Sequence, residues 1–202
     1  DFPLFITSLL GNDASTSAQV KLMDINFPES FISQFSGPKY GIENLRKNFK
    51  VQGRPFLLNM IKPCLGLTPK EASNVFYYSA LGGSDIIKDD ELMGNPFYSD
   101  PAERVEEFKK AAQRAYNKTG HKTYYFVNIT SGVTDIQKNL KRVEDAGADG
   151  IMINFAVVGY SMLNYVAAHT KLPVLGHSAG AGTFFEGLTS GLSSPLAIGK
   201  LA

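Results

Sequence analysis

From Pro55 onward, the sequence alternates apolar strand patterns with helix patterns, and this alternation constrains the fold more than any other feature. The stretches 81–87 and 146–152 repeat one arrangement, in which a glycine ends a helix pattern, a short polar turn follows and an apolar strand pattern begins. Strands that are apolar along their length and joined by helices are typical of a parallel sheet covered on both faces. The sequence therefore predicts an α/β fold.

The alternation favours a barrel over a doubly wound sheet, because one unit repeats and no G-x-G-x-x-G motif follows any strand. Thr68, Pro69 and Glu71 have the pattern of an N-cap, a first helical position and a capping box. A closed (β/α)8 TIM barrel takes about 250 residues, so we expect only about its first five βα units. The predicted strands are 56–61, 85–88, 123–128, 150–155 and 172–176, and the predicted helices are 68–81, 101 to about 117, 134–145 and 161–169.

Residues 1–54 have a different pattern, in which proline and glycine interrupt short segments. We expect strands at 5–10 and 19–25, and we interpret residues 1–54 as a connector from an N-terminal region. Residues 55–202 would form the partial barrel, which is the catalytic domain. The chain lacks an initiator methionine and ends inside an apolar-periodic segment, so we expect it to be a fragment of a longer protein.

Composition excludes several classes of protein. A hydrophobic content of 44% and a formal net charge of +1, with scattered basic residues, are typical of a globular protein that does not bind nucleic acid. No stretch approaches the roughly 20 apolar residues of a membrane span, and no signal-peptide pattern is visible. The single cysteine, Cys64, fits a reducing compartment, so we expect a cytoplasmic location.

Polar or ionisable side chains lie at the carboxyl ends of all five predicted strands. In parallel barrels the active site lies at the carboxyl ends of the strands, so these side chains are the candidate functional residues. In chain order they are Lys62; Lys88, Asp90 and Glu91; Asn128; Asn154; and His177.

The run 88–91 (Lys-Asp-Asp-Glu) is either a solvated turn or part of a magnesium site. Carboxylates suit Mg²⁺, a hard cation that prefers six oxygen ligands. A lysine beside them would repel the metal unless reaction with CO₂ turned its amine into a carbamate. That reaction needs a neutral amine, and burial of Lys88 would supply one by lowering its pKa.

Lys62 is either a structural amine paired with a carboxylate or a general base. A lysine near Mg²⁺ has its ammonium form disfavoured, which moves its pKa towards neutrality, where a base works best. Such a base would remove a proton next to a carbonyl, and the metal would hold the resulting enediolate oxygens.

The other strand-end residues have less specific interpretations. His177 is either a hydrogen-bonded core residue or a group that binds substrate or shuttles a proton. Asn128 and Asn154 either orient a substrate hydroxyl or satisfy backbone groups. We interpret Cys64 as a packing residue, because no histidine is close to it in sequence.

Several segments resemble the RuBisCO large-chain superfamily. The stretches 61–67 and 83–91 resemble its first two barrel strands, 37–42 and 53–55 resemble the segment leading into the barrel, and 7–12 resembles the end of its N-terminal domain. The resemblance implies that residues 1–54 are the end of an N-terminal α+β domain and the connector to the barrel. The resemblance implies a carbamylated Lys88 that holds Mg²⁺ with Asp90 and Glu91. It also implies Lys62 as the enolisation base, His177 as a substrate-binding residue, and a homodimer in which Asn12 reaches the partner subunit's active site.

The departures from that family imply a RuBisCO-like protein of the non-carboxylating, form IV type. Carboxylases have lysine where this chain has Cys64, arginine where it has Ser178, and aspartate where it has Asn154. The methionine-salvage diketo-phosphate enolases have a lysine base where Asn12 stands, and they lack a proline at position 63. The resemblance therefore favours Mg²⁺-dependent enolase or isomerase chemistry on a phosphorylated ketose. The alternatives are decarboxylation of a β-keto sugar acid phosphate and a non-catalytic regulatory role, with ribulose-bisphosphate carboxylation the least favoured.

Overall fold

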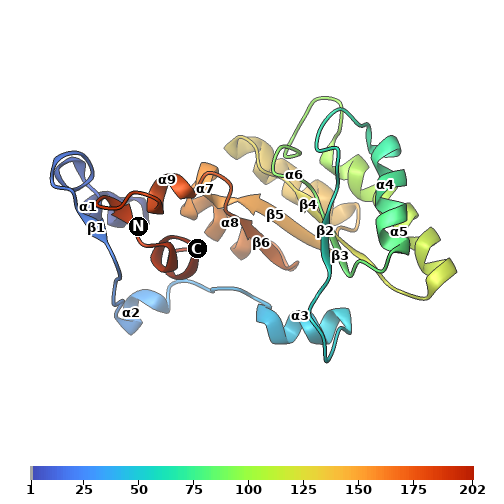
Figure 1. The fold of residues 1–202 in the computed structure, drawn as a ribbon, viewed down its shortest axis with the longest axis horizontal. Helices are drawn as coiled ribbons and strands as arrows, with labels where there is room; N and C mark the ends of the chain where they lie inside the picture. Colours follow the sequence, from blue (N-terminus) through green and yellow to red (C-terminus); the bar gives the residue numbers. More distant parts are fainter. Residues whose placement is uncertain (1) are drawn as a thin grey trace. The chain divides into compact units, whose positions relative to one another are not determined.

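The computed structural model describes residues 2–202, which form two compact units. Figure 1 shows the order of the elements along the chain. The larger unit comprises Pro38–Ile153 and His169–Leu175. The smaller unit comprises the N-terminal segment up to Gly37 together with Asn154–Ala168 and Gly176–Ala202.

A five-stranded sheet is the central element, and its strands follow one another in chain order. Such an order is that of consecutive barrel strands, whereas a doubly wound sheet reverses direction at a switch point. The register of the parallel pairs places Met60 opposite Lys88, and Lys88 opposite Phe126. The strands are β2 (Leu58–Met60), β3 (Ile86–Lys88), β4 (Tyr124–Asn128), β5 (Gly150–Asn154) and β6 (Val174–His177).

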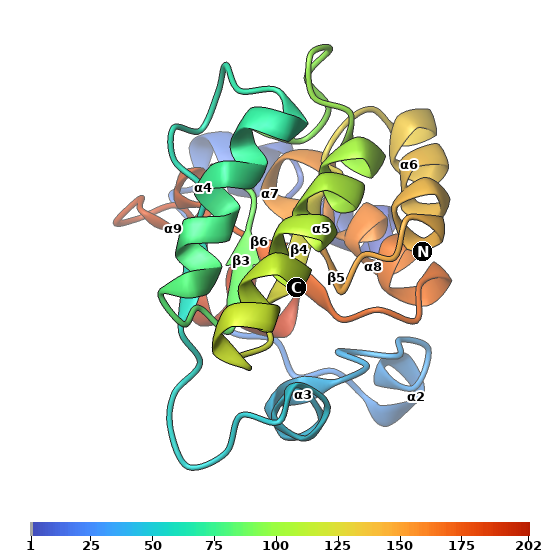
Figure 2. The ribbon, with the colours of Figure 1, turned by 90° about the vertical axis from the view of Figure 1, so that its right-hand side faces the viewer.

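Three long helices stand side by side next to the strands of the larger unit (Figure 2): α4 (Pro69–Leu81), α5 (Pro101–Thr119) and α6 (Val133–Asp145). The predicted capping box of α4 is confirmed, because Thr68 and Glu71 bond each other's backbone N–H groups. Asp100 caps α5 by accepting from two backbone N–H groups. Phe76 of α4 and Phe108 of α5 pack on the buried ring of Tyr125, which joins both helices to β4.

The first strand differs from the prediction. The pattern at 56–61 predicted a buried strand, but β2 is three residues long, and Leu57 and Leu58 are 51% and 41% exposed. These side chains are exposed because β2 lies at the edge of the sheet and, among the described strands, pairs only with β3. An apolar run therefore does not by itself distinguish an edge strand from a central one.

The sequence did not predict α3 (Gly41–Phe49), which precedes the barrel strands. Its last residue, Phe49, stacks on Tyr124 at the start of β4, with ring centroids 3.9 Å apart. Lys50 ends the helix in a left-handed conformation, with φ of 56°. The helix thus packs at the amino-terminal end of the sheet, opposite the end where the candidate site residues lie.

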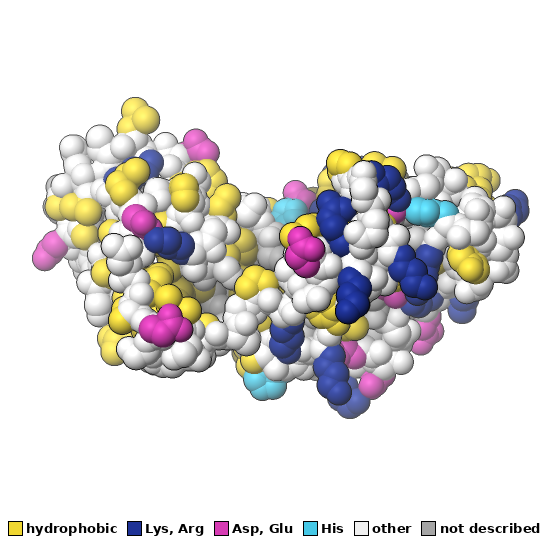
Figure 3. All heavy atoms as spheres, turned by 90° about the horizontal axis from the view of Figure 1, so that it is seen from below, with side chains coloured by type: hydrophobic (Ala, Val, Ile, Leu, Met, Phe, Trp, Pro, Cys, Tyr) yellow, Lys and Arg dark blue, Asp and Glu magenta, His cyan; other side chains and the backbone are white. Residues whose placement is uncertain are grey.

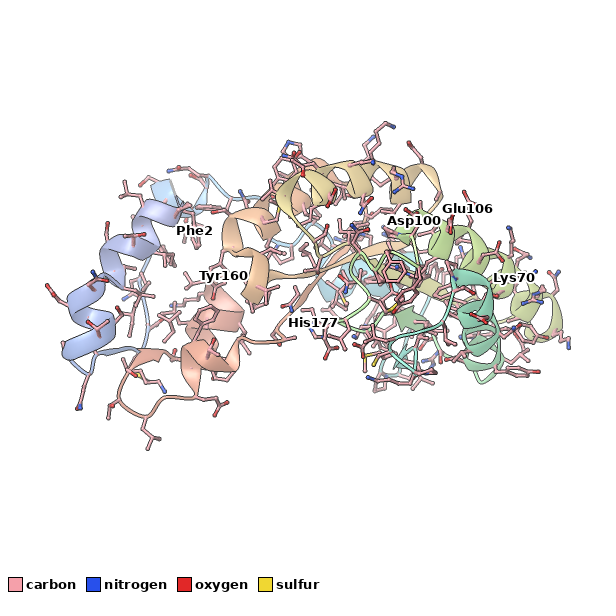
Figure 4. The ribbon with its side chains drawn as sticks, turned by 90° about the horizontal axis from the view of Figure 1, so that it is seen from above. Phe2, Lys70, Asp100, Glu106, Tyr160 and His177 are labelled. Carbon is pink, nitrogen blue, oxygen red and sulfur yellow. The ribbon has the colours of Figure 1, made fainter. Side chains whose placement is uncertain are left out.

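The smaller unit corrects one prediction and confirms another in part. Residues 5–10 were expected to be a strand, but α1 (Phe2–Leu9) is a helix. The reason is that Phe2, Ile6 and Leu10 are spaced four residues apart, so a helix places all three on one face, where they pack on the apolar cluster around Leu196. Figure 4 shows Phe2 beside Tyr160, and their ring centroids lie 5.7 Å apart. The predicted strand at 19–25 is reduced to β1 (Lys21–Leu22), which pairs with β7 (Gly191–Leu192).

The remaining elements are short, apart from α8. They are α2 (Glu29–Ile32), α7 (Phe155–Val158), α8 (Tyr160–His169), α9 (Gly182–Phe185) and two π-helical turns, η1 (Asp13–Ser17) and η2 (Pro195–Lys200).

Apolar side chains are visible among the charged ones on the face shown in Figure 3. Phe97 and Leu188 are among the most exposed large apolar residues of the chain. Within residues 2–202, none of the helices combines the length and the apolar character that crossing a bilayer requires.

Candidate active site

Lys62 and Asp90 meet at the carboxyl ends of the neighbouring strands β2 and β3. The Lys62 ammonium donates a hydrogen bond to Asp90 Oδ2 at 2.5 Å, and Asp90 Oδ1 accepts from the Leu92 backbone N–H at 3.0 Å. The Asp90 side chain is 1% exposed, whereas that of Lys62 is 57% exposed. The structure therefore brings two of the predicted site residues into direct contact.

This contact changes the pKa values of both groups. The hydrogen bond that Lys62 donates to Asp90 raises the pKa of Lys62, against the lowering effect of desolvation. Burial acts to raise the pKa of Asp90, but the hydrogen bond and charge of Lys62, helped by the Leu92 N–H, bring it below its ordinary value. The contact with Asp90 thus stabilises the ammonium form of Lys62. Lys62 would have to lose this proton before it could act as a base.

Lys88, the last residue of β3, is buried next to this pair. Its Nζ donates to the Asp89 carbonyl oxygen at 3.0 Å and to Met60 Sδ, a weak acceptor, at 3.2 Å. Burial lowers the pKa of Lys88, although the charges of Glu91, Asp90 and Asp89 oppose that change. Burial thus makes the neutral amine, the form that reacts with CO₂, more accessible than in an exposed lysine.

The donor set fits Mg²⁺ only if Lys88 contributes an oxygen. Within residues 2–202, no three side chains of the His, Cys, Asp and Glu types converge where they could hold a metal ion. Asp90 and Glu91 stand two and three residues after Lys88, and Asp90 already holds a cation, the Lys62 ammonium. Oxygen ligands from the two carboxylates and from a carbamate on Lys88 would suit a hard divalent ion.

Asp89, which the sequence analysis did not single out, has a role of its own. Its carboxylate is 2% exposed and accepts hydrogen bonds from the Tyr125 hydroxyl at 2.7 Å, the Asn128 backbone N–H at 2.9 Å and Arg104 Nε at 3.2 Å. Burial raises the pKa of Asp89, while the charge of Arg104 acts to lower it. The Lys88–Glu91 run could have indicated this, because side chains of an extended segment alternate between faces and Asp89 must point away from its neighbours.

Asn128 supports the backbone of the two carboxylate residues. Its side-chain amide donates to the carbonyl oxygens of Asp90 at 3.0 Å and Glu91 at 3.2 Å, and its Oδ1 accepts from the Thr130 N–H at 2.9 Å. Both amide hydrogens are thereby used. The geometry favours the backbone-satisfying alternative for Asn128 over contact with a substrate hydroxyl.

The other three predicted residues, His177, Asn154 and Asn12, lie in the smaller unit. His177 ends β6 and is labelled in Figure 4; its Nδ1 accepts from the Ala179 backbone N–H at 3.1 Å, so a neutral His177 carries its proton on Nε2. Asn154 ends β5 and is buried, and Asn12 is exposed before η1.

Comparison with known proteins identifies the family. Residues 41–199 match the family described as the ribulose bisphosphate carboxylase large chain, catalytic domain. The chain is 38% identical over 200 residues to a ribulose bisphosphate carboxylase-like protein of Archaeoglobus fulgidus, covering 98% of this chain and 46% of that protein. It is 34% identical over 203 residues to a 2,3-diketo-5-methylthiopentyl-1-phosphate enolase of Bacillus mycoides, covering 100% and 49%. The chain thus spans about half the length of these curated relatives.

Solved structures agree with this result. The chain resembles a rubisco-like protein (MtnW) from Alicyclobacillus acidocaldarius, with a TM-score of 0.92, 28% identity, and coverage of 99% of this chain and 51% of that one. It also resembles an archaeal ribulose 1,5-bisphosphate carboxylase/oxygenase, with a TM-score of 0.89, 30% identity, and coverage of 100% and 48%. The predicted partial TIM barrel is confirmed, and the chain belongs to the family of RuBisCO large chains and RuBisCO-like proteins.

Proposed function

We propose that the protein containing this chain catalyses Mg²⁺-dependent enolisation of a phosphorylated ketose, by removing a proton next to the carbonyl. The observation that carries the proposal is the meeting of Lys62 with Asp90 beside the buried Lys88. Two amines and a carboxylate from neighbouring strand ends are the groups that this chemistry requires.

In this proposal Lys88, as its carbamate, would hold Mg²⁺ together with Asp90 and Glu91. Bound Mg²⁺ would act as a Lewis acid that stabilises negative charge on the substrate oxygens. Lys62 would take the proton from carbon, which requires its ammonium first to lose a proton. Release from Asp90 favours that loss, because the hydrogen bond to Asp90 is the main cause of the raised pKa of Lys62.

The polar residues at the other strand ends would bind the substrate. We assign this role to His177 and Asn154, whereas Asn128 would support the backbone of Asp90 and Glu91. Asn12 would reach the active site of a partner subunit in a homodimer. Cys64 and Ser178 stand where carboxylases carry cationic side chains. Because these cations are missing, we propose no CO₂ fixation.

The test is exchange of the substrate's α-proton into D₂O, followed by NMR on a panel of phosphorylated ketoses that includes ribulose 1,5-bisphosphate. We expect Mg²⁺-dependent exchange in the wild type and its loss in Lys88→Ala and Lys62→Ala. Lys138→Ala, which changes an exposed lysine on α6, is the matched control. Undiminished exchange in Lys88→Ala would refute the metal-site assignment, and release of CO₂ from a β-keto acid phosphate would identify a decarboxylase.

A second candidate is the reaction named for several relatives, enolisation of 2,3-diketo-5-methylthiopentyl 1-phosphate. It is favoured by the 34% identity to those enolases over the whole chain. Asn12 argues against it, because the resemblance places a lysine base at that position. Assaying the diketone beside the ketose panel separates the two candidates. A protein that turns over neither kind of substrate but binds Mg²⁺ would have the non-catalytic role.

A further inference from the structure

Behind the proposed metal ligands lies a buried polar network that the enolisation chemistry does not use. Asp89 stands between Lys88 and Asp90 in sequence, and its side chain points away from theirs, towards helix α5. There it meets Arg104, which is fully buried. The network therefore lies on the outer side of the same backbone segment that presents Lys88, Asp90 and Glu91.

The Arg104 guanidinium holds main-chain oxygens as well as the carboxylate. It donates to the carbonyl oxygens of Ser99 at 2.5 Å, Met93 at 2.6 Å and Asn128 at 3.0 Å, with a longer contact to Gly94 at 3.4 Å. These carbonyl groups belong to the loop after Glu91, to the residue before the α5 N-cap and to the end of β4. One side chain thus joins three backbone segments that are separate in sequence.

The loop after Glu91 also packs closely against the backbone beyond β4. A Cβ at Gly94 would lie 2.0 Å from the Thr130 carbonyl oxygen, so only glycine fits there. Asn128 continues the link, because its amide holds the carbonyl oxygens of Asp90 and Glu91. Arg104 and Asn128 therefore restrain the two carboxylate residues from opposite ends of one short loop.

A buried ion pair is by itself weak ground for assigning a role, because desolvation offsets the attraction between the charges. The arrangement around Arg104 has a more specific feature, namely that a planar guanidinium provides five N–H donors in fixed directions. Here those donors reach Asp89 and the carbonyl groups of the loop. Asp89 supplies the charge that a buried Arg104 needs, and Tyr125 and the Asn128 N–H orient the Asp89 carboxylate.

We propose that Arg104 is a positioning residue: through Asp89 and the carbonyl oxygens of Met93 and Asn128, it fixes the loop that presents Asp90 and Glu91 to a divalent cation. The inference rests on the proposed function, because it takes those two carboxylates as the ligands. In this arrangement Arg104 would touch neither metal nor substrate. It would act on the geometry of the ligand residues, and losing such a partner weakens metal binding.

Two variants of the full protein test this, with Mg²⁺ in bicarbonate buffer as the probe. Arg104→Lys keeps the buried charge but loses the planar set of donors. Tyr125→Phe removes one donor to Asp89 and keeps the ring in the core. By calorimetric titration we expect the Kd for Mg²⁺ to rise about 10- to 100-fold in Arg104→Lys, and to rise less in Tyr125→Phe.

Two control variants separate positioning from general stability. Arg114→Lys changes an exposed arginine on the same helix, and Ile136→Val removes a buried methyl group from α6. Both should bind Mg²⁺ with the wild-type Kd. The proposal would be overturned if Arg104→Lys bound Mg²⁺ with the wild-type Kd. It would also be overturned if Ile136→Val lowered Tm as much as Arg104→Lys does and lost as much affinity for Mg²⁺.

Amide hydrogen exchange without metal provides a second readout. The Leu92 and Met93 amides bond to Asp90, so they report on the loop, while the Val127 amide in β4 reports on the larger unit. We expect Arg104→Lys to exchange at least about 10-fold faster at Leu92 and Met93, with Val127 unchanged. Equally faster exchange at all three amides would show that Arg104 stabilises the larger unit as a whole and does not specifically position the loop. If the wild type binds no Mg²⁺, the proposed function fails, and this exchange still decides the role of Arg104.

Discussion

Lys62 Nζ lies 2.5 Å from Asp90 Oδ2, although the two residues are 28 positions apart in sequence. The register of β2 and β3 explains the contact, because Met60 pairs with Lys88 and the two following segments leave the sheet side by side. In the proposed mechanism the same carboxylate ligates Mg²⁺ and the same amine is the base. The ion pair thus represents the resting arrangement. In it Lys62 binds the Asp90 carboxylate that would otherwise ligate the metal, and Asp90 keeps Lys62 protonated.

We expect Asp90→Asn to lower the pKa of Lys62. The hydrogen bond that Lys62 donates to Asp90 is the largest cause of the raised pKa, and the Asp90 charge adds to it. Asparagine removes the charge and weakens the bond, so the pKa should move towards the ordinary lysine value of about 10.4. The measurement is an NMR pH titration of the lysine side chains, with Lys62→Met to assign the signal.

Glu107→Gln is the matched control for this titration. Glu107 raises the pKa of Lys110 by a hydrogen bond on the exposed face of α5, so its loss should shift Lys110 and leave Lys62 unchanged. A Lys62 titration that is the same in wild type and Asp90→Asn would show that the two groups are not paired in solution.

Gly94→Ala should destabilise the protein and weaken Mg²⁺ binding together. The added Cβ would lie 2.0 Å from the Thr130 carbonyl oxygen, so the loop after Glu91 has to move. Such overpacking costs about 1–3 kcal/mol in the free energy of unfolding, measurable by urea denaturation.

Gly132→Ala is the control, because nothing lies within 4 Å of a Cβ at that position. It should cost less than Gly94→Ala and leave the Kd for Mg²⁺ unchanged. Equal effects of the two substitutions would contradict the close packing of the loop.

The stabilising effect of Asp85 should disappear in acid. The hydrogen bonds from Arg54 are the main cause of the lowered pKa of Asp85, and Leu57 N–H and His121 contribute. A carboxyl group with a lower pKa in the folded state binds fewer protons there. Its contribution is therefore present above the unfolded value of about 3.9, and it is lost as pH falls through the folded value.

Asp85→Asn should accordingly lower Tm at pH 7 and have less effect below about pH 3.9. Asp145→Asn removes a carboxylate from an exposed pair with Lys141 and should change Tm little at either pH. A difference between wild type and Asp85→Asn that stays constant from pH 7 into acid would contradict the assignment.

Much of the barrel could be predicted from local sequence signals. The glycine-ended helices, the capping box at Thr68 and the apolar strands each act through residues close in sequence, and the structure contains them within a few residues of the predicted ends. The nearness of Lys62 to the 88–91 run could also be predicted, because carboxyl ends of adjacent parallel strands meet at one edge. Pairing with a carboxylate was one of two interpretations of Lys62 that the sequence left open.

Tertiary contacts explain what the sequence analysis missed. The segment 5–10 has apolar residues that suit either a strand or a helix, and packing against the cluster around Leu196 decides for α1. In sequence, nothing separates Arg104 from the other charged residues of α5. Its burial depends on Asp89 and on backbone carbonyl groups from distant segments, which no local pattern reveals.

The most direct test of the central claim is a calorimetric titration of the full protein with Mg²⁺, with and without bicarbonate, in wild type and Lys88→Met. If Lys88 becomes a carbamate that ligates the metal beside Asp90 and Glu91, bicarbonate will tighten Mg²⁺ binding in the wild type and have no effect in the variant. Wild-type affinity that is identical with and without bicarbonate would contradict the account.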